Sequence, residues 1–512
     1  MIIVTPLFLL LLGALLVVLF HEGRYPEIWV SVAVSVGVSS FLLSRFRHRR
    51  VGGLMLLLWI VYALPFIHII PYLTFDFEDE APLVLWGLAV NPYMVDARVI
   101  QLTAMIGAVG AVGIALGVSL SRQIIVRDTG SDTLGRRRRF NSLPMSALLF
   151  WAIVGVLISW LTAPRSTVFT AVYTESKSAL DGMNFSSAWM VSYVFLIYVY
   201  CDAILDQNPA RRWLKKAIAY SAVAYVVVFL QLLRGDRESL PLVLSLFLVH
   251  RYWAAPVTQK RRSRLSKKRI VLIVLALGSV SILTGTLRSS LADVRDISQL
   301  SEVLLQLYES NAINASNLLA GTWSGALLTP LSVAGDHVYG LLPLNLGSDY
   351  VNILLSVPPG FIADAVSYAR PIDGLSGPAW AMRYGMGGTH ATVVPFMNFR
   401  MVGVLVIPAV WAYLLTRYEK RALKCLTVRN LALLCAVAMA SPHWLWYGEK
   451  SGINALIIWA LLGVAYRVSL SFGTLGQPPK LHRTAGGLQV VRTVSKRLLP
   501  LDSSSDSAGS PC

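Results

Sequence analysis

Residues 98–120 read RVIQLTAMIGAVGAVGIALGVSL, and this stretch decides the fold class of the chain. Its one charged residue, Arg98, stands at its start. A helix rises about 1.5 Å per residue, so the stretch is long enough to cross the roughly 30 Å of hydrocarbon in a bilayer. The sequence therefore predicts a membrane-spanning helix here.

Apolar stretches of similar length recur along the chain. The first begins near the N-terminus, and it is predicted to be a membrane span because no Lys or Arg precedes it and no small-residue cleavage site follows it. With residues 98–120, these stretches predict an all-α polytopic integral membrane protein with about 12 transmembrane helices. The others lie near residues 3–20, 28–44, 52–71, 145–164, 186–205, 216–233, 240–256, 270–287, 400–417, 428–447 and 452–470.

The composition excludes an ordinary soluble enzyme. The 512 residues are 55% hydrophobic and only 14% charged, and the mean hydropathy is +0.61. Globular proteins have about a quarter charged residues. The net charge of +18 does not indicate nucleic-acid binding, because the basic residues stand at the ends of apolar stretches. The four cysteines have no metal-ligand spacing and are assigned no function.

Basic residues are concentrated in alternate connections, and this asymmetry sets the predicted orientation. Six segments hold 33 of the 45 Lys and Arg residues. Because basic loops stay in the cytoplasm, these segments and both termini are predicted to be cytoplasmic. The six segments are 45–50, 122–139, 211–216, 251–269, 417–429 and the tail from 467.

The chain divides into four predicted regions. Residues 1–288 contain transmembrane helices 1–9, and residues 400–470 contain helices 10–12. Residues 289–399 are predicted to form one large external loop domain with amphipathic or re-entrant helices, because Asp336-His337 and a Pro-Pro-Gly sequence interrupt its apolar runs. Residues 471–512 are a basic tail rich in Ser, Gly and Pro, predicted to be disordered and cytoplasmic.

A short external turn supplies the first candidate site. Arg234 and Arg237 flank Gly235 and Asp236, and two arginines at this spacing can grip a phosphate through bidentate hydrogen bonds. The alternative is an internally salt-bridged turn. Arg288 ends the ninth apolar stretch, where it is either a phosphate contact or a snorkelling anchor at the interface.

The end of the large loop supplies the second candidate site. Arg370, Arg383 and Arg400 surround His390, which follows a Gly-Gly-Thr turn. Histidine suits general-base chemistry near neutral pH, and arginines would hold an anionic leaving group. The alternative is a structural histidine. Asp336-His337 is a second external pair with the same two interpretations.

Three features resemble the Wzy-type O-antigen polymerases, which join oligosaccharide repeat units, and more distantly the O-antigen ligases. The segment 233–238, LRGDRE, precedes an apolar stretch, and a large external loop follows some spans later. That loop ends in His390, then Asn398-Phe399, with Gly403 in the next apolar stretch. The chain departs from the family at Arg400, where the family commonly has Gly after Asn-Phe.

The resemblance implies a GT-C-like, polymerase–ligase type of fold in the bacterial inner membrane, with the loop 289–399 on the periplasmic side. It implies an inverting glycosyltransferase that polymerises oligosaccharide units carried on undecaprenyl diphosphate, without a nucleotide sugar, metal or other cofactor. His390 is then the candidate base. The candidate diphosphate clamps are Arg234, Arg237, Arg288, Arg383, Arg370 and Arg400.

The implied partners are the lipid-linked oligosaccharides and the lipid bilayer, with a chain-length regulator and a flippase as candidate protein partners. No nucleic acid is expected. One alternative function is a GT-C type glycosyltransferase that uses a polyprenyl-phosphate sugar. The acidic run 76–80, DFEDE, would then be its metal or catalytic site rather than a solvated loop. The other is a transporter of polysaccharide or lipid, which would need charged or broken helices at the bilayer midplane.

Overall fold

The computed structural model describes a helical bundle and one short β-hairpin. The described residues are 26–47, 52–66, 69, 93, 96–123, 143–162, 188–206, 208–231, 239–249, 253, 302, 305–306, 325–355, 390–424, 427–447, 454–475, 481–484 and 487–490.

The predicted all-helical class is confirmed in the described part of the chain, apart from the hairpin. A π-helical segment, η6 (Tyr225–Gln231), continues α7. The strands β1 (Leu481–Thr484) and β2 (Gly487–Val490) pair antiparallel within the predicted tail. The helices are α2 (Pro26–Arg47), α3 (Gly53–Ala63), α4 (Ala97–Gln123), α5 (Met145–Thr162), α6 (Ala188–Leu205), α7 (Pro209–Ala224), α8 (Ser239–Leu248), α13 (Gly325–Val338), α14 (Ser348–Leu355), α17 (Val393–Lys424), α18 (Val428–Tyr447) and α20 (Asn454–Leu475).

The helices have the composition of a membrane protein. Three contain a segment long and apolar enough to cross a bilayer, namely Glu27–Phe46, Ala97–Ser121 and Val393–Leu423, and five shorter helices are also apolar. Of the stretches predicted as spans, 3–20 and 270–287 lie outside the described residues, and a helix overlaps each of the others. Some boundaries differ: α7 and α17 each begin seven residues before the predicted starts at 216 and 400, and α20 continues five residues past 470.

Helices α4 and α17 pack together in parallel, and two glycines of α4 permit their close approach. A Cβ atom on Gly113 would lie 2.3 Å from the carbonyl oxygen of Leu405, and one on Gly117 would lie 2.1 Å from that of Ala409. Both helices advance by four residues between these contacts, so they run in the same direction. Small residues at such positions let helix backbones meet, as membrane helices commonly do.

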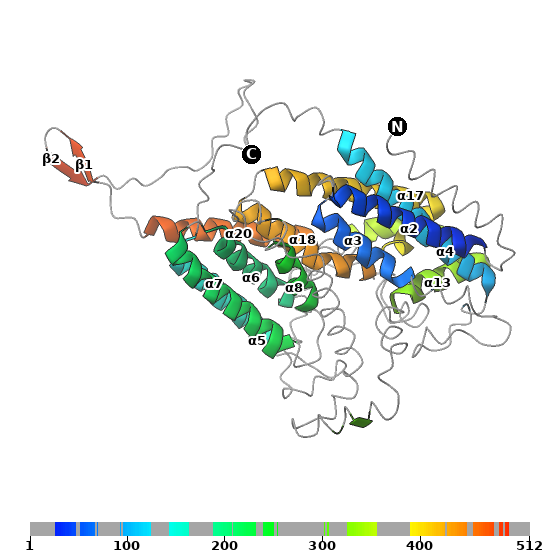
Figure 1. Cartoon of the computed structure of the whole chain (residues 1–512), viewed down its shortest axis with the longest axis horizontal. Helices are drawn as coiled ribbons and strands as arrows, with labels where there is room; N and C mark the ends of the chain where they lie inside the picture. The colour runs from blue at the N-terminus through cyan, green and yellow to red at the C-terminus, as the bar shows by residue number, and fades with distance from the viewer. Residues whose placement is uncertain are drawn as a thin grey trace.

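Helix α18 lies in the centre of the bundle, with α3, α6, α8, α17 and α20 packed around it (Figure 1). Its faces toward these neighbours are apolar, and Leu431, Leu434, Cys435 and Met439 are fully or almost fully buried. Helices α5 and α7 pack beside α6 at one side of the bundle (Figure 1).

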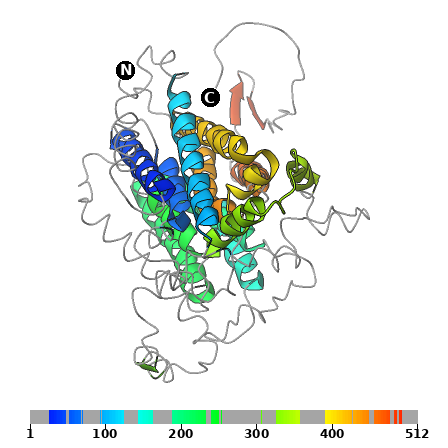
Figure 2. The same ribbon diagram turned by 90° about the vertical axis from the view of Figure 1, so that its right-hand side faces the viewer.

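A second apolar core joins α13 to the first turns of α4. Leu328, Leu331 and Ala334 of α13 pack with Val99 and Ile100 of α4. Figure 2, which looks at the right-hand end of Figure 1, shows α13 and α14 in yellow-green at this end. We call it the α13 end: the start of α4, α13, the segment to α14, and the first part of α17. It contains the described part of the predicted loop domain.

Candidate functional site

Only two of the seven predicted site residues, His390 and Arg400, belong to the described part of the chain. Both lie at the α13 end, at the start of α17. The acidic run 76–80 and the other five, Arg234, Arg237, Arg288, Arg370 and Arg383, fall outside the described residues.

Helix α17 folds back on itself at Arg400. The backbone of Arg400 has φ 55° and ψ −144°, which interrupts the helix between residues 399 and 401. The turn after residues 393–399 is so tight that a Cβ atom on Gly403 would lie 2.3 Å from the carbonyl oxygen of Pro395. A positive φ of this kind favours glycine, which has no Cβ atom. Here an arginine occupies the strained conformation, at a penalty of about 1–3 kcal/mol.

Not every N–H donor of the Arg400 guanidinium has an acceptor among the described residues. Its Nη2 atom donates to the carbonyl oxygens of Leu342 at 2.9 Å and Pro343 at 3.2 Å. Its carbon lies 5.7 Å from the centre of the Phe396 ring. The other terminal nitrogen, Nη1, is buried and has no hydrogen-bond partner among the described residues. A buried cationic donor without an acceptor is unfavourable, so this nitrogen is suited to an anionic oxygen supplied by a ligand.

Asn398 holds this turn against the segment before α14. Its Oδ1 accepts a hydrogen bond from the backbone N–H of Gly347 at 2.8 Å, and its Nδ2 donates to Asp349 Oδ2 at 2.8 Å. Asn345 also donates to Asp349 Oδ2, at 2.7 Å. Gly347 has φ 91°, so its backbone takes a conformation that side chains disfavour. Asn398 therefore positions Arg400 through the backbone of α17.

His337, in the last turn of α13, lies beside Arg400. Its ring meets the Phe396 ring edge to face, with 5.3 Å between the ring centres. The side chain is exposed, and neither ring nitrogen has a partner among the described residues. Partial burial lowers the pKa of His337 below its ordinary value, and the positive charge of Arg400 lowers it further. His337 is therefore a neutral imidazole at pH 7, able to accept a proton.

His390 is fully buried. Its Nε2 lies 3.2 Å from the carbonyl oxygen of Tyr62, and only a protonated nitrogen can pair with a carbonyl. Its Nδ1 then accepts from the backbone N–H of Thr392 at 3.3 Å. The rings of Tyr62 and Phe66 each lie 5.1 Å from the imidazole, centre to centre. In this conformation both ring nitrogens are engaged within the protein.

Two tyrosine–aspartate pairs fix α13 to the start of α4. Tyr93 donates to Asp336 at 3.0 Å, and Tyr339 donates to Asp96 at 2.5 Å, while the two tyrosine rings stack at 5.7 Å. Arg98 also pairs with Asp96, at 3.1 Å. Partial burial acts to raise the pKa of Asp96, but the hydrogen bonds from Arg98 and Tyr339 outweigh it, and the pKa lies below its ordinary value. These pairs position His337 relative to α4.

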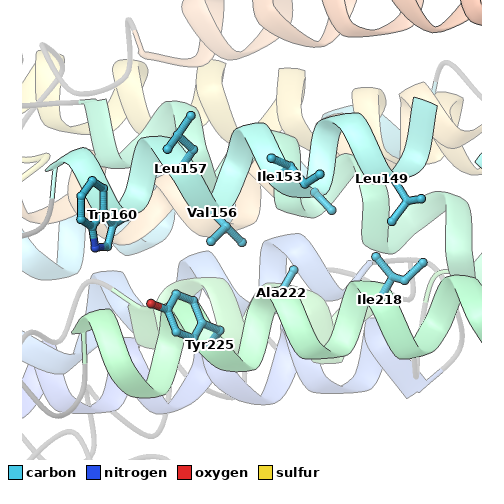
Figure 3. A pocket seen from close by; sticks show the side chains of 9 residues that line it. Leu149, Ile153, Val156, Leu157, Trp160, Ile218, Ala222 and Tyr225 are labelled. Carbon is cyan, nitrogen blue, oxygen red and sulfur yellow. The ribbon is translucent and has the colours of Figure 1, made fainter. Parts of the chain in front are cut away.

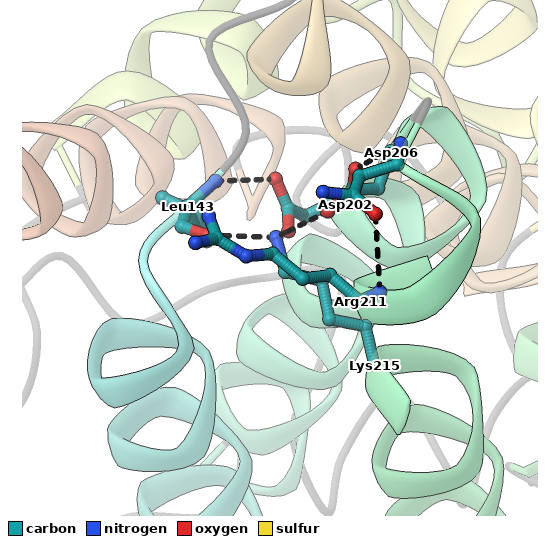
Figure 4. Close-up of polar contacts among 6 residues, drawn as sticks. Leu143, Asp202, Asp206, Arg211 and Lys215 are labelled. Atoms are coloured by element: carbon teal, nitrogen blue, oxygen red, sulfur yellow. Dashed lines mark hydrogen bonds and ion pairs between the residues drawn. The ribbon is translucent and has the colours of Figure 1, made fainter. Parts of the chain in front are cut away.

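A buried ionic cluster, not recognised in the sequence, lies where α5 begins, α6 ends and α7 begins (Figure 4); we call this the α7 end. Lys215 Nζ contacts Asp202 Oδ2 at 2.6 Å, Asp206 Oδ2 at 2.9 Å and the carbonyl oxygen of Leu143 at 2.7 Å. Asp202 Oδ1 accepts from the backbone N–H of Leu143 at 2.8 Å. Two of the three N–H donors of this lysine hydrogen-bond to Asp202 and Leu143, and Asp206 adds an ion pair.

The α13 end therefore combines a cationic donor that has no acceptor among the described residues with an exposed neutral imidazole. Among the residues described, no group of three or more His, Cys, Asp or Glu comes together to hold a metal ion. The chain matches no protein-family model. No curated protein and no solved structure is significantly similar to it.

Proposed function

We propose that this chain is a membrane glycosyltransferase that polymerises oligosaccharide repeat units carried on undecaprenyl diphosphate. The reaction takes place at the outer face of the bacterial inner membrane and builds a surface polysaccharide. The α13 end is its active face. The observation that carries the proposal is Arg400, which keeps a cationic side chain at a strained position and leaves one nitrogen of that side chain without an acceptor among the described residues. Residues held in such strained conformations cluster at functional sites.

The proposed orientation places the α13 end outside, both termini in the cytoplasm and about twelve helices across the bilayer. Its support is the concentration of Lys and Arg in alternate connections. The parallel packing of α4 and α17 agrees with it, because both helices are predicted to run from the outer face inward.

The proposed reaction needs two groups. The hydroxyl of the acceptor sugar attacks the anomeric carbon of the donor, and the bond from that carbon to the diphosphate oxygen breaks with inversion. A base takes the hydroxyl proton, and a cation stabilises the negative charge that grows on the departing diphosphate. We assign Arg400 Nη1 to the diphosphate. Arg234, Arg237, Arg288, Arg370 and Arg383 stay candidate clamps for the same group.

Two histidines are candidates for the base. His390 is the candidate from sequence, and its use as a base requires Nδ1 to lose the N–H of Thr392. His337 needs no such change, because its ring is exposed beside Arg400. We therefore assign the proton transfer to His337 and give His390 the role of holding α3 against the start of α17.

The test is the surface polysaccharide of a deletion strain, separated on a gel. The strain should show a single repeat unit, and the wild-type chain should restore a ladder. The variant His390→Gln should restore it too, since glutamine can donate and accept at the same position, whereas His337→Gln should not. Membrane levels of each variant are measured alongside.

Each other outcome has a definite meaning. Loss of the ladder with His390→Gln and retention with His337→Gln would return the base to His390. If both variants restore the ladder, neither histidine is the base, and the base does not lie at the α13 end. A normal ladder in the deletion strain would overturn the proposed function for that polymer. Dependence on a polyprenyl-phosphate sugar and on the run 76–80 would favour the GT-C alternative instead.

A further inference from the structure

Helices α5 and α7, with the first residue of η6, flank an open apolar groove (Figure 3). These helices lie on the side of the bundle away from the α13 end (Figure 1). The cavity has a volume of about 370 Å³, within the range of small-ligand sites. Figure 3 shows the side chains of the two helices facing each other across it. It is lined by Leu149, Ala152, Ile153, Val156, Leu157, Trp160, Ile218, Ala222 and Tyr225.

The groove has one aromatic end and one basic end. Trp160 and Tyr225 face each other at one end (Figure 3). At the other end, the α7 residues that line the groove continue with helical spacing from Ile218 to Leu214 and Arg211. Arg211 is exposed, and its side chain extends from α7 in the direction of Leu143, at the start of α5 (Figure 4). The cationic side chain of Arg211 therefore lies at one end of the apolar groove.

The surface around this mouth fits the boundary between lipid and water. Trp213 is 73% exposed and Leu214 is 44% exposed, both next to Arg211 and Arg212. Exposed tryptophan and basic side chains together are typical of the headgroup region of a bilayer. Lys215 of the neighbouring cluster is paired with its own carboxylates, whereas Arg211 is exposed and Arg212 partly exposed beside it.

We infer that this groove is a binding site for an anionic phospholipid. One acyl chain lies between α5 and α7, and the phosphate pairs with Arg211, with Arg212 adding positive charge. In the proposed orientation the lipid belongs to the cytoplasmic leaflet, across the membrane from the α13 end. The site is independent of the proposed glycosyl transfer, since no residue of the α13 end takes part.

The test is native mass spectrometry of the delipidated full-length protein in detergent. Phosphatidylglycerol and phosphatidylcholine with identical oleoyl chains are added in equal amounts. The wild-type chain should retain one phosphatidylglycerol in preference to phosphatidylcholine. Arg211→Gln should lower that preference about fivefold, as expected for one arginine near an anionic lipid surface. Arg417→Gln, an exposed arginine of α17, is the matched control and should change nothing.

A second variant separates binding from folding. Ala222→Phe fills the groove without touching a charge, and it should reduce retention of both lipids while the gel-filtration profile stays that of the wild type. Equal retention of the two lipids by the wild type would overturn the proposal. So would an Arg417→Gln effect as large as that of Arg211→Gln. Preferential retention of undecaprenyl phosphate over phosphatidylglycerol would overturn the assigned occupant.

Discussion

The α7 end and the α13 end each contain a cationic side chain with a buried nitrogen atom, but the contacts of the two nitrogen atoms differ. At the α7 end, Lys215 hydrogen-bonds to Asp202 and to the carbonyl oxygen of Leu143, and it forms an ion pair with Asp206. At the α13 end, Arg400 sits at a positive φ and keeps one nitrogen without an acceptor in the described chain. A satisfied cluster stabilises a fold, whereas an unsatisfied and strained one indicates a place where a ligand completes the structure.

The comparison predicts that the α7 end governs stability. Lys215→Met should leave two buried carboxylates without a cation and destabilise the protein by about 3–5 kcal/mol. The measurement is the temperature at which the detergent-solubilised protein loses its monodisperse gel-filtration peak. Activity per folded molecule should stay normal.

A charge-free version of the same cluster is the control. The triple variant Asp202→Asn, Asp206→Asn, Lys215→Met removes both signs together and should recover most of the lost stability. If Lys215→Met unfolds no earlier than the wild type, the cluster does not stabilise the bundle and the contrast between the two ends fails.

Arg400→Gly tests the α13 end, where we expect a large loss of activity and little change in stability. Glycine relieves the positive φ, a gain of about 1–3 kcal/mol, and gives up hydrogen bonds of about 1 kcal/mol each. The net change in stability should therefore stay within about 1 kcal/mol. Polymerisation in membrane vesicles should fall roughly 10²–10³-fold, as for removal of one charge-stabilising donor.

The control for that variant is Arg417→Gln, which removes an exposed arginine of the same helix. Its activity should equal that of the wild type. A fully active Arg400→Gly enzyme would mean that the strained arginine has no part in the reaction, and the unpaired nitrogen would then be a structural feature only.

The close contact between α4 and α17 continues from the α13 end into the bundle, and Gly117→Ala should loosen it. The added methyl group would press on the carbonyl oxygen of Ala409, and we expect a loss of about 1–3 kcal/mol. Gly463→Ala on α20 is the matched control, because its nearest neighbouring atom is 3.9 Å away. That variant should be as stable as the wild type or up to about 1 kcal/mol more stable, from helix propensity. Equal behaviour of the two variants in thermal denaturation would contradict the close packing of α4 and α17.

The helices were the most predictable part of this molecule. Hydropathy over windows of about twenty residues located α2, α4 and α18 to within a few residues, because burial in lipid and burial in a helical bundle select the same side chains. The start of α17 was missed, since a hydropathy window cannot detect a helix that turns back at one residue. The positive φ at Arg400 and the close approach of Gly403 to Pro395 are features of the backbone, which hydropathy does not measure.

The site was less predictable than the fold. The sequence predicts Arg400 as a diphosphate contact and His390 as the base, and the choice between His390 and His337 stays a prediction that the two glutamine variants test. The two histidines differ in burial and in hydrogen bonds to Tyr62, 328 residues away, and such long-range contacts leave no local pattern. The Lys215 cluster was missed because its members are ordinary charged residues near helix ends, and only the packing of α5, α6 and α7 brings them together.

The smallest expected effect concerns the coupling between Arg400 and His337. The positive charge of Arg400 opposes protonation of His337 and so lowers its pKa. Arg400→Gln removes that charge and should therefore raise the pKa of His337. The measurement is an NMR titration of ¹³C-labelled histidine in detergent, with the His337 signal identified by its absence in His337→Gln. It needs no substrate and no activity, so it reports on the unliganded site alone. A His337 signal that titrates identically in both proteins would show that the two residues do not share a site. The base for the acceptor hydroxyl would then have to lie elsewhere, and the contrast between the ends would rest on Arg400 alone.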